Sequence, residues 1–192
     1  MTHIAIGWDT QHRTAAWSSS SARSSLPASN LGLDSLGYVW QTLDGVDSAS
    51  IVADVGSSLP IGFAALLDFA GTASGTFRLR VSDSDATGAG AGADGGRFEP
   101  LWRHWVLLLP AEVSGRYRRL DVTQTGAAWL QAASMPMGPV WYPAHNVEIG
   151  VAWSVETEDQ RSATRGGTEY IDEGPMRRVL SARLPAATIA EH

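Results

Sequence analysis

The chain has 192 residues, a formal net charge of −6 and no cysteine. This length suffices for one large domain, or one domain with an extension, that buries its core without disulfides. The lack of cysteine excludes thiol catalysis and cysteine-based zinc sites, and the negative charge argues against a surface that binds the nucleic-acid backbone.

We expect no signal peptide at the N-terminal residues. Residues 1–9 lack the basic start and apolar core of a signal peptide. The longest apolar run, residues 105–109, is far shorter than the roughly 20 residues that a helix needs to cross a bilayer. We therefore expect no membrane insertion.

The first 82 residues predict short strands separated by turns. Apolar residues alternate with polar ones at 51–55 and at 77–81, which indicates strands with one buried face. Residues 61–69 are apolar on both faces of a strand except at Asp68, so they predict a central strand that is covered on both sides. A buried Asp68 in that strand would need hydrogen-bond donors. Turn residues fill 57–58, 71–75, 82–96 and 136–143. This pattern predicts an all-β antiparallel β-sandwich.

The C-terminal part predicts further β structure. Residues 147–155 form a long one-sided alternating run, and 162–183 resemble a β-hairpin that turns at 165–168. Only residues 184–192 show helical character. We expect a β-sandwich at 1–145 and a strand-and-hairpin extension at 146–192, which could continue into further chain.

Several motifs that would carry chemistry are incomplete. Gly90–Gly95 matches a dinucleotide fingerprint, but no helix follows it, so a flexible loop is the better interpretation. The five histidines have no zinc spacing, and no nucleophile elbow is present. Glu156 and Glu158 lie on the polar side of a predicted strand, which favours a solvated face over a glycosidase pair. We expect no enzyme activity, no cofactor and no metal site.

The loop between Asp83 and Asp94 leaves one alternative open. Asp83, Asp85, Thr87 and Asp94 could supply oxygen ligands to calcium, although the helices of the usual calcium loop are missing. The other interpretation is a solvated turn.

Aromatic residues are the candidate ligand-binding groups. The chain has eight tryptophans, and aromatic rings can stack on sugars. The candidates at predicted strand ends or loops are Trp40, Trp102, Trp105, Trp141 and Tyr142. Packing in the core or at a subunit contact is the competing explanation, because tryptophan also fills sandwich cores and interfaces.

The order of several short motifs resembles a known family. These motifs are LPASNL at 26–31, VW at 39–40, IVADVG at 51–56, FRLRVS at 77–82, DGG at 94–96, MGPVWYPAHN at 137–146, RGG at 165–167 and GPMRR at 174–178. Together they resemble tail proteins of tailed phages and gene transfer agents that carry a galactose-binding-like, discoidin-type jelly roll. Residues 67–70 depart from the family pattern, which often has a His-Asn pair there.

The resemblance implies a structural role in a phage-like virion tail, at the tail tip, the baseplate or a fibre attachment. It implies other tail proteins as partners, a symmetric homo-oligomer in the particle, synthesis in the host cytoplasm, and help in attaching to the host surface. The alternative function is a carbohydrate-binding module that recognises host surface glycans.

Overall fold

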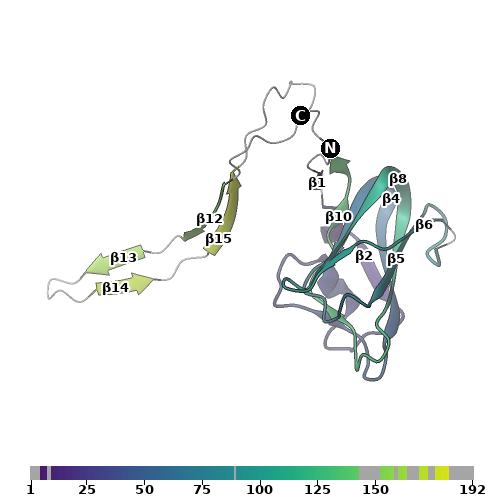
Figure 1. Cartoon of the computed structure of the whole chain (residues 1–192), viewed down its shortest axis with the longest axis horizontal. Coiled ribbons are helices and arrows are strands. Elements are labelled where there is room, and N and C mark those ends of the chain that lie inside the picture. The colour runs from purple at the N-terminus through teal and green to yellow at the C-terminus, as the bar shows by residue number, and fades with distance from the viewer. Residues whose placement is uncertain are drawn as a thin grey trace. The chain divides into compact units, whose positions relative to one another are not determined.

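The computed structural model describes residues 5–7, 10–88 and 90–142, and the backbone of four strands between residues 152 and 181. The chain divides into two compact units (Figure 1). One is Ile6–Trp141, and the other combines Met1–Ala5 with Tyr142–His192. The predicted boundary at residue 145 lies outside the described residues and stays a prediction.

Two long strands, β4 (Ser48–Leu66) and β8 (His104–Thr123), form the centre of the larger unit. They pair antiparallel, with register shifts between Asp54 and Leu59 and between Ile61 and Phe63. Such irregularities bend strands. Each long strand therefore contributes to both halves of a folded-over, seven-stranded sheet (Figure 1).

Shorter strands complete the two halves of this sheet. The first half of β4 pairs with β2 (Ala16–Ser19), and the second half of β8 pairs with β5 (Thr76–Ser82), which carries β6 (Ala91–Asp94) at its edge. The second half of β4 pairs with β10 (Met137–Gly138), and the first half of β8 pairs with β7 (Arg97–Glu99).

Smaller elements complete the larger unit. The strand β1 (Ile6–Gly7) pairs with β11 (Val140–Trp141), and β3 (Trp40–Gln41) pairs with β9 (Gln131–Ala132). Two 3₁₀ helices, η1 (Gln11–Arg13) and η2 (Ala28–Gly32), lie between strands. No helix among the described residues is long and apolar enough to span a membrane.

The core lies between the two halves of the sheet. Phe77, Leu79 and Val81 of β5 point inward, as their alternation predicts. Burying such side chains stabilises a fold by about 1.5–3 kcal/mol each. Arg118 of β8 is also completely buried, opposite the apolar Ala53 of β4 and Val81 of β5.

The all-β sandwich prediction is confirmed, with corrections in detail. The predicted strands at 51–55 and 61–69 are parts of the single strand β4, because residues 55–58 form an irregularity within the strand and not a turn. The predicted turns at 82–96 and 136–143 contain β6 and the short strands β10 and β11. Asp68 is not a buried strand residue: it follows β4 with φ +49°, is half-buried, and pairs with Arg103.

The described part of the smaller unit contains two antiparallel pairs of strands. The strand β12 (Ala152–Thr157) pairs with β15 (Met176–Ser181), and β13 (Gln160–Ala163) pairs with β14 (Glu169–Asp172). The pairing of β13 with β14 agrees with a hairpin around the predicted turn. Residues 164–168, the first part of the predicted strand at 147–155, and the predicted helix at 184–192 lie outside the described residues.

Candidate functional site

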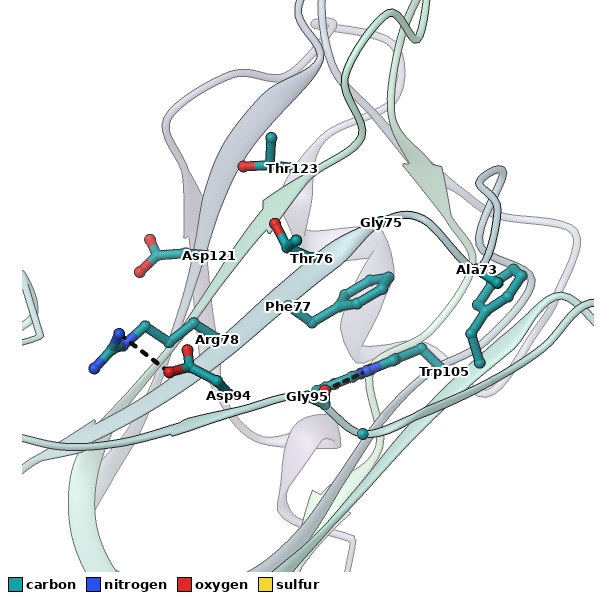
Figure 2. Close-up of a pocket in the computed structure, with 12 residues that line it drawn as sticks. Ala73, Gly75, Thr76, Phe77, Arg78, Asp94, Gly95, Trp105, Asp121 and Thr123 are labelled. Carbon is teal, nitrogen blue, oxygen red and sulfur yellow. Dashed lines mark hydrogen bonds and ion pairs between the residues drawn. The ribbon is translucent and has the colours of Figure 1, made fainter.

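A pocket of about 500 Å³ opens where β6 separates from β5 (Figure 2). The two strands pair as far as Arg78 and Asp94, after which the chain turns through Gly95 and Gly96 towards β7. The loop before β5 and the ends of β5 and β8 form the remaining walls. The lining residues are Ala73, Gly75, Thr76, Phe77, Arg78, Asp94, Gly95, Gly96, Phe98, Trp105, Asp121 and Thr123.

Aromatic side chains form the inner side of this pocket. The rings of Phe77 and Trp105 stack with centroids 4.7 Å apart and an angle of 17° between their planes. Phe69 packs edge-on against both Phe77 and Phe98. This packing fixes the rings, so the inner side of the pocket is apolar and rigid.

Two glycines allow the backbone to pass close over Trp105. Gly95 has φ +96° and Gly96 has φ +99°, a region that side-chain-bearing residues rarely adopt. The Trp105 Nε1 donates to the Gly95 carbonyl oxygen at 2.8 Å. A Cβ atom at Gly96 would lie 2.5 Å from Trp105 Nε1, so this position requires glycine.

Polar side chains form the outer wall. The strand register places Thr76 opposite Thr123 and Arg78 opposite Asp121. Nη1 of Arg78 lies 3.3 Å from Oδ2 of Asp94, and Figure 2 shows this pair at the pocket. The wall therefore presents hydroxyl, guanidinium and carboxylate groups beside an aromatic surface.

Two arginines in the neighbouring cross-strand pair, Arg80 and Arg119, already bind the Asp121 carboxylate. Its Oδ2 accepts a hydrogen bond from Arg80 Nε at 2.9 Å, and its Oδ1 accepts one from Arg119 Nε at 2.7 Å. Arg119 Nη1 also donates to the Thr87 carbonyl oxygen at 3.0 Å. These contacts hold the loop after β5 against the sheet.

The turn between β7 and β8 lies close to the loop after β4. The Phe69 N–H donates to the Arg103 carbonyl oxygen at 2.7 Å, and the Arg103 guanidinium lies 3.4 Å from the Asp68 carboxylate. Asp68 and Arg103 both have positive φ values, which is a costly conformation for residues other than glycine. The exposed Trp102 lies in the same turn.

The five predicted aromatic candidates occupy different environments. Trp40 and Trp105 are buried in the core, so neither ring offers an open face to a sugar. Trp141 is half-buried in β11. Trp102 and Tyr142 are 53% and 50% exposed. The structure brings only Trp105 of these five into the pocket lining.

The calcium interpretation of the 83–94 loop gains no support from the geometry. Asp85 accepts hydrogen bonds from the N–H and hydroxyl of Thr87, and Asp94 lies in β6 beside Arg78. No group of three or more His, Asp or Glu side chains that could hold a metal ion lies among the described residues.

Sequence reasoning missed the polar wall. Arg78 was expected on a wet strand face and Asp94 was considered only as a calcium ligand, while Thr76, Asp121 and Thr123 were not singled out as site residues. The alternation of β5 contains the signal for Arg78, whereas its juxtaposition with Asp121 depends on the pairing of β5 with β8.

No family model matches the chain, and no curated protein sequence matches it. Solved structures do resemble it. A chitosan-binding module from a chitosanase/glucanase of Paenibacillus sp. IK-5 has 18% identity and a TM-score of 0.57, covering 69% of this chain and 100% of that one.

Two further solved structures have similar scores. The lectin domain of lectinolysin, complexed with Lewis B antigen, has 15% identity and a TM-score of 0.56, covering 69% of this chain and 97% of the other. The family 32 carbohydrate-binding module of NanJ from C. perfringens, in complex with galactose, has 12% identity and a TM-score of 0.53, covering 70% and 98%. The chain therefore shares the galactose-binding-like β-sandwich fold of these modules.

Proposed function

We propose that the Ile6–Trp141 unit is a carbohydrate-binding module and that its ligand occupies the pocket beside β5 and β6. The observation that carries this proposal is the combination, in one pocket, of an aromatic inner side with a polar wall of hydroxyl and charged groups. The fold shared with modules that bind chitosan, Lewis B antigen and galactose supports it.

The pocket chemistry suits a sugar ring. Sugars have apolar C–H faces that pack on aromatic groups and hydroxyls that exchange hydrogen bonds with polar side chains. Because Trp105 and Phe77 are almost fully buried, they support the pocket from below, and Thr76, Thr123 and Arg78 supply most ligand contacts. The exposed ring of Trp102 lies outside the pocket lining, on the turn that follows β7, and serves in this proposal as an additional stacking surface.

Glycan binding by the full chain tests this proposal. A glycan array followed by titration calorimetry should identify a ligand, and Thr76→Val should weaken its binding by roughly three- to tenfold through loss of one hydrogen bond. Trp102→Ala should weaken binding as well, because Trp102 lies on the turn that follows β7, whose Phe98 lines the pocket. Trp129→Ala removes a similarly exposed ring from the loop between β8 and β9 and should leave the affinity unchanged. A chain that binds none of the arrayed glycans contradicts the proposal, and a loss confined to Trp129→Ala moves the site elsewhere.

A structural role in a phage-like virion tail is the second candidate function. The sequence resemblance suggests it, and the paired strands of the smaller unit match the hairpin expected after the jelly roll. In this proposal the second unit contacts neighbouring tail proteins, in a symmetric oligomer, while the sandwich attaches to the host surface. A mass-spectrometric inventory of purified particles tests it, and a chain that is absent from every particle contradicts it.

A further inference from the structure

The charged groups at the pocket differ in how open they are to a ligand. The charged residues that line it are Arg78, Asp94 and Asp121. Two arginines outside the lining, Arg80 and Arg119, bind Asp121 and offset its negative charge. Arg78 and Asp94 are therefore the charged lining residues that a ligand meets.

The two aspartates differ in how firmly they are engaged. Each Asp121 oxygen already accepts a hydrogen bond from an arginine Nε, so this carboxylate has little capacity left for a cationic ligand. Asp94 is 69% exposed and contacts Arg78 through a single 3.3 Å approach. Such a solvated pair contributes little and separates easily.

Arg78 is the group that can exchange partners. Its side chain is 47% exposed, and among the described residues its guanidinium pairs with no acid other than Asp94. Gly92 on β6 leaves room for it, because a Cβ there would lie 3.0 Å from Nη2. A guanidinium presents a planar fork of donors that fits a carboxylate or a sulfate.

We propose that the pocket selects an acidic glycan and that Arg78 binds the anionic group, a ring carboxylate or a sulfate, of its sugar. The inference rests on the proposed carbohydrate-binding function and specifies its ligand class. Thr76 and Thr123 form the cross-strand pair next to Arg78 and Asp121 on the same wall, and their hydroxyls bind neighbouring sugar hydroxyls. Arg80 and Arg119 lower the cost of bringing a second anion beside Asp121.

Calorimetry of the full chain with four ligands tests the ligand class: galacturonate, sulfated galactan, neutral galactan and glucosamine oligosaccharides of equal length. We expect one of the acidic ligands to bind about tenfold more tightly than the neutral one, the value of one charge-assisted contact. This preference should shrink as salt is added. The tighter of the two acidic ligands identifies the anionic group.

Two variants that should change the binding of acidic ligands in opposite directions test the role of Arg78. Arg78→Gln should abolish the acidic preference while neutral binding persists, and Asp94→Asn should strengthen acidic binding a few-fold by releasing Arg78. Arg13→Gln and Asp44→Asn remove exposed ion-pair partners that do not line the pocket, and both should leave the preference unchanged.

Three outcomes would overturn the inference. Tightest binding of glucosamine, equal binding of acidic and neutral ligands, or an acidic preference that survives Arg78→Gln would each do so. In these cases a glycan still binds, so the proposed function stands. If none of the four ligands and none of the arrayed glycans binds, both proposals fail.

Discussion

Replacing Arg118 with methionine is expected to stabilise the sandwich. Arg118 is completely buried in the core. Its Nη2 donates to the Leu59 carbonyl oxygen at 3.1 Å and approaches that of Pro60 at 3.4 Å, while Nε and Nη1 have no hydrogen-bond partner among the described residues. A buried cation without an acidic partner carries a desolvation penalty that an apolar side chain of similar volume avoids.

The size of this desolvation penalty follows from the pKa of Arg118. Burial lowers the pKa of Arg118 from its ordinary value to about 10. At about 1.4 kcal/mol per pKa unit, the charged form costs the fold roughly 3 kcal/mol at neutral pH. Methionine removes this cost but leaves the two carbonyls without their donor, a loss of about 1–2 kcal/mol. The free energy of unfolding should therefore rise by about 1–2 kcal/mol.

Urea unfolding at pH 7 and at pH 10.5 measures the effect. The advantage of Arg118→Met should shrink at the higher pH, because the native arginine loses its proton around pH 10 while the arginine of the unfolded chain, with its ordinary pKa, still keeps its proton. Arg118→Lys retains a buried charge and should show no gain. Destabilisation of Arg118→Met by about 2 kcal/mol or more would refute the reasoning, because it would mean that the guanidinium is satisfied in the native state.

Three further predictions concern single positions. Gly96→Ala should lower the free energy of unfolding by about 1–3 kcal/mol, because the new Cβ meets the Trp105 ring. Gly45→Ala, also at positive φ but with open space around it, should lower the free energy of unfolding by about 1 kcal/mol. Equal losses in the two variants would contradict the close approach at Gly96. Burial lowers the pKa of His12, so stability should fall as the pH drops below 6.5, and His12→Gln should reduce that fall in a thermal-unfolding series. Hydrogen bonds from an arginine lower the pKa of Asp54, so Asp54→Asn should destabilise the protein at pH 7 and lose this difference in acid; a constant difference would contradict the pairing.

The sequence predicted local strand structure well. The alternation in β5 directly predicts which of its side chains are buried. The prediction from sequence failed where an irregularity inside a strand resembles a turn. Gly56 and the serines after it suggested that a strand ends there, but β4 continues through them. It also failed at β6, because a run of alanine and glycine has low β propensity and pairs only through tertiary context.

The candidate site was harder to predict than the fold. Trp102 and Trp105 are three residues apart, yet one is exposed in a turn and the other is buried in β8, a difference that depends on where the strand begins. The polar wall joins Arg78 to Asp121, which are distant in sequence and meet only through the register of β5 with β8. The alternation within a strand predicts its buried face, but not which residue of a distant strand lies opposite each position.

The continuity of β4 and β8 has a consequence for cooperativity. Since both strands run through both halves of the sheet, neither half can open without breaking the hydrogen bonds of a strand that the other half needs. The larger unit should therefore lose structure in one transition. A ligand held beside β5 would then also slow amide exchange in β2 and β10, on strands that do not contribute to its pocket.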